Sequence, residues 1–127
     1  MFSRNSEKLE SFVGSNSYFR GEMKTKGTLR VDGTLEGDVE ADWLILGERG
    51  ILKGNVKARG VVVGGRIDGI ITSREVLEIR PKGQVVGDIS TGKLTVVEGG
   101  ILQGRSTMHQ EESKVVELQP KDRIKDI

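Results

Sequence analysis

Aliphatic residues recur in a short glycine-punctuated unit along the middle of the chain. Five copies of Gly-x-aliphatic-x-Gly begin 15 to 18 residues apart, at residues 33–37, 50–54, 65–69, 83–87 and 100–104. An aliphatic-x-aliphatic pair precedes each copy, and another aliphatic residue follows two positions after the second glycine, until Ser106 takes that place in the last copy. A degenerate earlier copy lies at Phe19, Gly21 and Met23. The chain is therefore an internal repeat with a period near 17 residues.

Apolar and polar positions alternate within each copy, as at Leu29, Val31, Leu35 and Val39. This period of two predicts strands, and no part of the repeat keeps helical spacing. Each repeat then supplies three short strands separated by corners, and the two glycine columns mark places where the chain turns or needs φ > 0. Coils stacked about 4.8 Å apart pair their backbones and enclose the aliphatic columns. The pattern predicts an all-β parallel β-helix, a solenoid of about six coils.

Outward positions give a test of this register, because stacked neighbours should tolerate one another's charge. The residue between the two glycines alternates in sign from Glu36 to Lys53 to Asp68. Ile45 and Val62 are also outward, on adjacent coils, and form a small patch that could serve lateral contact between rods. Trp43 falls at a corner, where its ring is expected to lie over neighbouring side chains.

Composition narrows the class of protein. The 127 residues suit one domain with tails, and the absence of Cys excludes disulfide frameworks and thiolate metal sites. A net charge of +1 gives no general attraction to nucleic acid. Residues 1–17 and 109–127 fit no coil. We therefore expect a flexible N-terminal tail over 1–17, a β-helix over 18–108 and a polar C-terminal tail over 109–127.

Candidate catalytic chemistry is sparse. His109 is the only histidine, and it falls after the last aliphatic column, in a tail rather than on a rigid scaffold. The repeat shows neither a phosphate-binding loop nor the Gly-Gly-x-Gly-x-Asp unit of calcium-binding nonapeptide repeats. The sequence therefore predicts a protein that is not an enzyme, with no cofactor, no metal site and no catalytic residue.

The recurring unit Gly-x-aliphatic-x-Gly-polar-aliphatic, from Gly33 through Ile89, resembles the repeat of the bactofilin family. The resemblance covers about residues 18–108 and implies a right-handed β-helix of roughly triangular cross-section. The general preference for right-handed crossovers agrees with that hand. The resemblance also implies end-to-end assembly, without nucleotide, into cytoskeletal filaments that act in bacterial cell shape and scaffold cell-wall enzymes.

Many bactofilins carry a short N-terminal membrane-targeting motif. Its apolar-then-basic character is matched here by Met1, Phe2, Arg4 and Lys8. The resemblance therefore implies a cytoplasmic protein at the inner face of the cytoplasmic membrane. Its expected partners are further copies of itself, membrane lipid bound by the tail, and cell-wall enzymes.

The two ends of a solenoid expose strand edges and core residues, which are templates for further pairing. We expect the N-terminal end to present Phe19, Met23, Leu29 and Val31, and the C-terminal end to present Leu94, Val96 and Leu102. Arg105 lies beside the C-terminal edge, and we expect its charge to weaken contacts there, since an incoming subunit must desolvate it.

Two other functions stay open at this stage. A monomeric β-helical module could bind a polysaccharide or a protein on an outer face around Ile45 and Val62, although Trp43 is the one aromatic side chain that the repeat offers there. A hexapeptide-type acyltransferase is the third candidate function. The six-residue repeat spacing of that enzyme class is not seen in this sequence. Size determination at several protein concentrations would separate a polymer from both.

Overall fold

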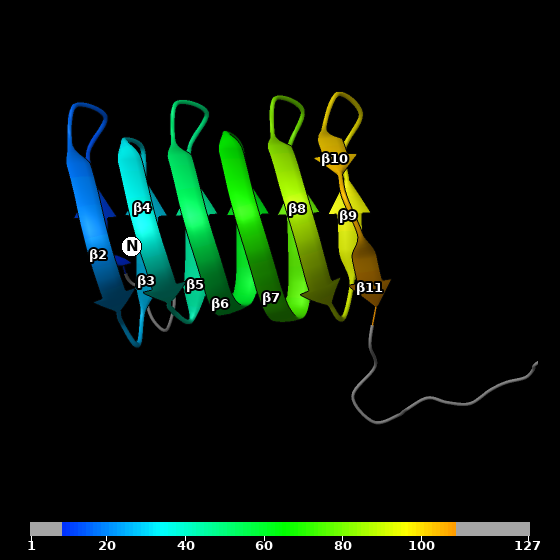
Figure 1. The fold of residues 1–127 in the computed structure, drawn as a ribbon, viewed down its shortest axis with the longest axis horizontal. Coiled ribbons are helices and arrows are strands. Elements are labelled where there is room, and N and C mark those ends of the chain that lie inside the picture. Colours follow the sequence, from blue (N-terminus) through cyan, green and yellow to red (C-terminus); the bar gives the residue numbers. More distant parts are fainter. Residues whose placement is uncertain (1–8, 109–127) are drawn as a thin grey trace, which may run out of the picture.

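A computed structural model describes residues 9–108, which form a single sheet of parallel strands wound into a solenoid (Figure 1). The described residues contain eleven strands and no helix. The strands are β1 (Leu9–Val13), β2 (Tyr18–Lys24), β3 (Thr28–Val31), β4 (Thr34–Glu40), β5 (Trp43–Leu46), β6 (Ile51–Val63), β7 (Arg66–Ile79), β8 (Gln84–Thr91), β9 (Leu94–Val96), β10 (Ile101–Gln103) and β11 (Ser106–Met108). The predicted all-β solenoid of about six coils is confirmed.

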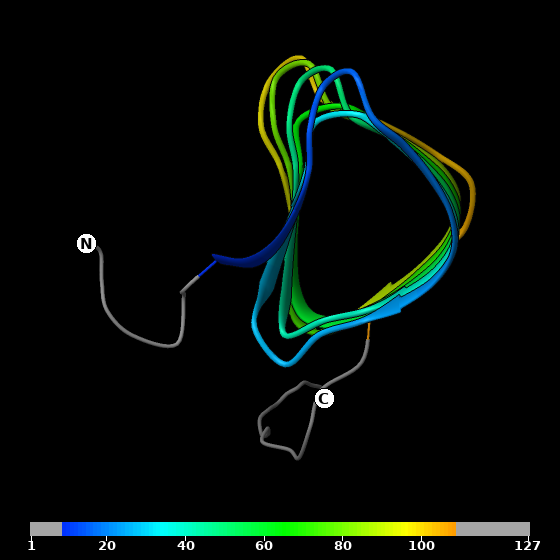
Figure 2. The same cartoon turned by 90° about the vertical axis from the view of Figure 1, so that its left-hand side faces the viewer.

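Each coil has three sides, which give the rod the roughly triangular outline of Figure 2. One side, here called the back face because it lies behind in Figure 1, consists of β1, β3, β5, residues 60–63 of β6, residues 76–79 of β7, and β9. The other two sides are formed by the front strands, which are β2, β4, residues 51–57 of β6, residues 66–73 of β7, β8, and β10 together with β11. Each front strand bends at a glycine, and its two halves form the two sides. In Figure 2 the chain turns clockwise as it recedes from the N-terminal end, so the solenoid is right-handed.

The aliphatic columns fill the inside of the rod. Leu35, Leu52, Ile67 and Val85 succeed one another on adjacent coils and are each fully buried. The other inward columns are equally covered along the middle of the rod and contain Leu29, Leu44, Val61 and Leu77; Val31, Leu46, Val63 and Ile79; and Val39, Val56, Ile71 and Ile89. Burial of these side chains is the main source of stability. Because each coil pairs only with its neighbours, it depends on them to cover its apolar side chains.

The second glycine of each repeat forms a ladder at the front bend. These glycines have φ between 136° and 149°, at Gly21, Gly37, Gly54, Gly69, Gly87 and Gly104. From Gly37 onward, an added Cβ would clash with the carbonyl oxygen of the glycine one coil earlier. Both the backbone conformation and the close approach of coils therefore require glycine here.

The first glycine column lies at turns, which is one of the two expected causes. None of these five residues has a positive φ. A Cβ on Gly33 or Gly65 would instead clash with backbone carbonyl oxygens of the preceding coil. The expected need for φ > 0 is therefore met only in the second column, and the first column permits close backbone approach at the turn.

The predicted boundary between tail and solenoid is wrong at the N-terminus. Residues 9–13 were assigned to the flexible tail, but they form β1, which pairs with β3 and places Val13 opposite Val31 in the core. The first coil is therefore complete, with β1 on the back face and β2 on the front. Residues 1–8 and 109–127, including Met1, Phe2, Arg4, Lys8 and His109, lie outside the described residues.

An ion pair ties two coils together at the lower corner. Arg59 donates two hydrogen bonds to the Asp42 carboxylate, at 2.9 and 2.8 Å, and its guanidinium lies 5.9 Å from the centre of the Trp43 ring. The Trp43 ring covers Gly60, which agrees with its expected corner position. The hydrogen bonds from Arg59 lower the pKa of Asp42 from its usual value of 3.8, and partial burial opposes this shift.

Candidate polymerisation surfaces

The N-terminal end of the rod is formed by β1 and β2. Within residues 9–108, neither strand has a partner on its outer side. Phe19 and Met23 are half-buried against the core because the inward columns that contain Leu35 and Val39 end with them. This end therefore offers unpaired backbone groups beside apolar side chains.

Tyr18 stands next to that edge and is 60% exposed. A hydrogen bond with the Glu36 side chain, on the next coil, raises the pKa of Tyr18 above its usual value of 10.0. Tyr18 was not expected at this end, because it occupies an outward position of a degenerate repeat.

The C-terminal end is formed by β9, β10 and β11. Leu94 and Leu102 are half-buried against the core, and Val96 is 44% exposed, whereas Val63 and Ile79 earlier in the same column are fully buried. Ile101 and Met108 are also exposed at this end. The core is thus open here in the described chain, and its cross-section is apolar.

Arg105 lies at the C-terminal edge as the sequence predicts. Its side chain is exposed, and its carbonyl accepts a hydrogen bond of 2.8 Å from the Ile89 N–H, which fixes the backbone just before β11. Ser106 follows it at the end of the column that contains Ile89 and is exposed.

Two predicted end residues are not at the end. Leu29 and Val31 were expected at the N-terminal surface, but both are fully buried. They lie one coil inside it, because β1 pairs with β3 and covers them. The structure thus brings together Phe19 and Met23 at one end, and Leu94, Val96, Leu102 and Arg105 at the other. Val13, like Tyr18, lies at the N-terminal end without having been predicted there from the sequence.

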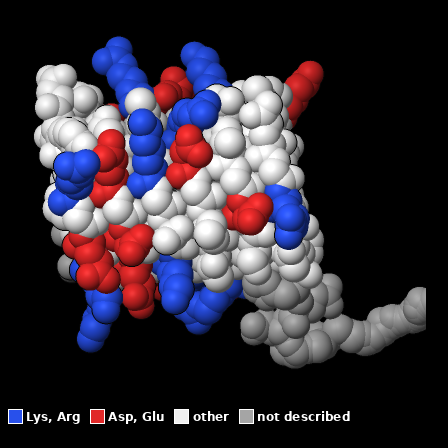
Figure 3. Space-filling model, viewed as in Figure 1, with Lys and Arg blue, Asp and Glu red and all other residues white. Residues whose placement is uncertain are grey.

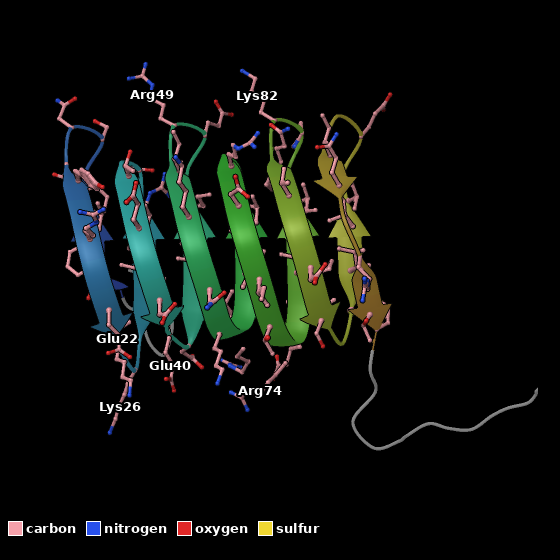
Figure 4. All side chains as sticks on the ribbon, in the orientation of Figure 1. Glu22, Lys26, Glu40, Arg49, Arg74 and Lys82 are labelled. Atoms are coloured by element: carbon pink, nitrogen blue, oxygen red, sulfur yellow. The ribbon has the colours of Figure 1, made fainter. Side chains whose placement is uncertain are left out.

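Charged side chains lie mainly along the length of the rod. Figure 3 shows both signs interspersed over the front strands. Figure 4 shows Arg49 and Lys82 projecting from the upper loops and Lys26 and Arg74 from the lower corner. The last described coil, residues 94–108, carries only Glu98 and Arg105 as charged residues. The sides therefore favour solvent, and the C-terminal end favours an apolar partner.

The described surface offers little for other chemistry. A hollow of about 270 Å³ on the lower front side is lined by charges of both signs from Glu22, Lys24, Asp38, Glu40 and Lys57, without an aromatic platform. Residues 9–108 contain no group of three or more His, Asp or Glu side chains that could hold a metal ion. They also contain no helix that is long and apolar enough to cross a membrane.

Comparison with known proteins identifies the family to which this chain belongs. The family model for bactofilins, described as polymer-forming cytoskeletal, matches residues 11–107. The chain belongs to the bactofilin family. Bactofilins are structural polymer-forming proteins and not enzymes, which agrees with the class that the sequence predicts.

Two bactofilins of Myxococcus xanthus (strain DK1622) are similar in sequence. The chain is 31% identical to Bactofilin BacP over 97 residues, which are 76% of this chain and 40% of BacP. It is 25% identical to Bactofilin BacO over 101 residues, which are 79% of this chain and 80% of BacO. The chain thus spans about two fifths of one relative and four fifths of the other.

A solved bactofilin structure has the same fold. The cryo-EM reconstruction of Thermus thermophilus bactofilin double helical filaments matches with a TM-score of 0.65 and 27% sequence identity. The match covers 76% of this chain and 99% of the Thermus chain. The shared part is thus the solenoid.

Proposed function

We propose that this bactofilin polymerises end to end through its first and last coils into cytoskeletal filaments, without nucleotide. The observation that carries the proposal is that both ends of the described rod combine open strand edges with uncovered core residues. Joining two ends pairs backbone groups and removes Phe19, Met23, Leu94 and Leu102 from water. Because each rod has two such ends, joining propagates into a filament.

Nucleotide has no evident place in this assembly. The strand turns of the repeat carry no phosphate-binding loop, and the hollow on the lower front side is lined by charges of both signs. Burial and backbone pairing supply the free energy of assembly in our proposal. The Thermus relative forms double helical filaments, which supports the same mode of growth for this chain.

A charge placed at an end tests the proposal. Val96→Lys puts a cation on the open end of the core, where Val96 is already 44% exposed and the fold should tolerate the change. Ile51→Lys is the matched control, because Ile51 is 36% exposed on the middle of the rod. We expect Val96→Lys to abolish sedimenting polymer and Ile51→Lys to leave it unchanged. Equal polymer from both variants would refute the assignment of this end.

In this proposal, the charge of Arg105 weakens the contact at the C-terminal end. Its charge lies beside β11, so an incoming subunit must desolvate it. Arg105→Leu should lower the protein concentration at which polymer appears, by about tenfold for each 1.4 kcal/mol that desolvation costs. If Arg105→Leu assembles no better than the unchanged chain in sedimentation at matched concentration, Arg105 has no such effect.

We further propose that the filaments lie at the cytoplasmic membrane and scaffold cell-shape or cell-wall machinery. Phe2 and the basic Arg4 and Lys8 would supply the lipid contact. One apolar insertion with a few charges binds lipid weakly, but a filament multiplies it through avidity. Removal of residues 1–8 should therefore lower co-sedimentation with anionic liposomes and leave filaments intact. Equal liposome binding by both chains would remove the tail from this mechanism.

A further inference from the structure

One straight column of outward side chains on the back face contains six residues. Adjacent coils stack them in register, and in order they are Phe12, Arg30, Ile45, Val62, Glu78 and Thr95. Ile45 and Val62 occupy the third and fourth coils, at the middle of the column, and both are half-buried. The Trp43 ring, which covers Gly60, borders this apolar centre.

An ion pair flanks the apolar centre on each side. On the second coil, the Arg30 side chain donates to Asp32 at 3.1 Å, and on the fifth coil Arg80 donates to Glu78 at 2.9 Å. Each pair joins a residue of a back-face strand to the residue two positions later, just past the strand's end, but the order of charge is reversed. The cation comes first in Arg30 and Asp32, and the anion comes first in Glu78 and Arg80.

Reversed order makes this face complementary to itself. Consider a second rod placed against the back face and related by a two-fold axis parallel to the strands, between the third and fourth coils. Each residue then faces the corresponding strand position on the coil at equal distance beyond the axis. Arg30 faces Glu78 of the second copy, Asp32 faces its Arg80, and Ile45 faces its Val62.

Two-fold arrangements with the axis parallel to the rod match either the charges or the apolar centre, but not both. With a two-fold axis parallel to the rod, each coil faces the same coil of the second copy. Arg30 is then opposite Arg30, and Glu78 opposite Glu78, when the columns meet. Like charges placed opposite one another oppose association. When that axis instead lies midway between the two positions, Arg30 faces Asp32 and Glu78 faces Arg80, but Ile45 and Val62 then lie opposite Gly47 and Gly64. The antiparallel arrangement therefore matches the charges and the apolar centre together.

We propose that the back face binds the back face of a second copy of this chain, with the two rods antiparallel and the apolar centre at Ile45 and Val62. The occupant is argued from the charge complementarity of Arg30 with Glu78 and of Asp32 with Arg80. These side chains are between 23% and 54% exposed and are open to a partner.

The area of the back face indicates how strongly two copies can pair. Six coils spaced about 4.8 Å apart and four-residue strands with a rise of about 3.3 Å per residue give roughly 400 Å² for each copy. A stable interface between single proteins buries about 800 Å² on each partner. Pairing is therefore weak between single rods, and repetition along a filament strengthens it through avidity. In this respect the inference rests on the proposed end-to-end filament.

A charge exchange tests the pairing between copies without breaking the Arg30–Asp32 and Glu78–Arg80 ion pairs within each copy. The first variant combines Arg30→Glu with Asp32→Arg, and the second combines Glu78→Arg with Arg80→Glu. Each variant keeps one cation and one anion two residues apart, so its melting temperature should match that of the unchanged chain. Across the interface, however, each variant places like charges opposite one another. A third variant that carries all four changes restores opposite charges at every facing position.

Negative-stain electron microscopy of the full chain gives the readout, as the fraction of filament length that is paired side by side. We expect paired filaments from the unchanged chain, at least about a tenfold loss of pairing in each two-residue variant, and recovery in the four-residue variant. Single filaments from the unchanged chain, or unchanged pairing in the two-residue variants, would overturn this inference and leave the end-to-end filament standing. Absence of all filaments would count against the proposed function itself.

The four-residue variant also tests whether the partner of the back face is a second copy of this chain. If the four-residue variant stays unpaired while both two-residue variants lose pairing, the charges act on something other than the facing copy, and the antiparallel assignment is wrong. Recovery in that variant requires that the two exchanged segments contact each other.

Discussion

At the scale of single residues, the second glycine of each repeat is the position least able to change. Gly54 has φ of 144°, and an added Cβ would clash with the carbonyl oxygen of Gly37. Gly21 has nearly the same φ, at 142°, but a Cβ there meets nothing closer than the Phe19 ring at 3.8 Å. The two positions thus share the backbone strain and differ in the clash.

Gly21→Ala should cost about 1–3 kcal/mol from the backbone conformation alone. Gly54→Ala should cost distinctly more, because the third coil must move away from the second. Thermal unfolding followed by circular dichroism measures both. If the two variants melt at the same temperature, the clash between coils does not explain the glycine ladder.

The inward columns tolerate no charge. Ile67 is fully buried between Leu52 and Val85, and an unpaired lysine there would lose its hydration. We expect Ile67→Lys to unfold or aggregate. Lys53→Ser on the exposed side of the third coil should change stability by less than about 0.5 kcal/mol. An unchanged circular dichroism spectrum and melting temperature for Ile67→Lys would mean that the inward register is wrong.

The ion pair between Asp42 and Arg59 makes stability depend on pH in acid. Because its hydrogen bonds hold the pKa of Asp42 below 3.8, the carboxylate stabilises the fold above that value, and this contribution is lost as the pH falls through the lower, folded-state pKa. Asp42→Asn should therefore lower stability by about 1 kcal/mol near neutral pH. Melting temperatures of the two chains should converge as the pH falls well below 3.8. A difference that persists there would assign the effect to packing rather than charge.

At the scale of elements, strand β1 covers the N-terminal end of the core. It covers Leu29 and Val31, which are fully buried beneath it. Removal of residues 1–16 should lower the free energy of unfolding by about 2–4 kcal/mol, since full burial of an aliphatic side chain contributes about 1.5–3 kcal/mol. Removal of residues 1–8 retains β1 and serves as the control. Equal urea midpoints for the two truncated chains would show that β1 adds no stability.

The strands of the repeat could be predicted because each inward column repeats at the same place in every coil. Leu52, Ile67 and Val85 needed only their alternation and the flanking glycines to be assigned. β1 escaped this reasoning because its inward position opposite Leu29 is Ser11, and its register shifts between Leu9 and Ser11. One signal could have found it, since Val13 lies 18 residues before Val31, which is one coil length.

The end surfaces were predictable only in part, for a related reason. Leu94, Val96 and Leu102 end columns that are visible in the sequence, so their exposure followed from the repeat count. Leu29 and Val31 were misplaced because the position of an end depends on the first strand, which the repeat does not mark. The charge complementarity of the back face required the stacking register, which places Arg30 and Glu78 in one column.

At the scale of the whole molecule, the rod separates two kinds of surface. The front strands carry interspersed charges (Figure 3). The two ends carry open strand edges and half-buried apolar side chains. In the proposed assembly the rod grows along its own axis, because the ends are the places where backbone pairing continues. The strands then lie across the filament, and the direction of strand stacking follows its length.

Diffraction from aligned filaments, or the power spectrum of cryo-EM images, tests that claim most directly. Filaments should form without nucleotide, and the strand spacing of about 4.8 Å should appear as a reflection along the filament axis. Filaments whose 4.8 Å reflection lies across the axis, or particles that stay single rods at every concentration, would contradict end-to-end growth through the first and last coils.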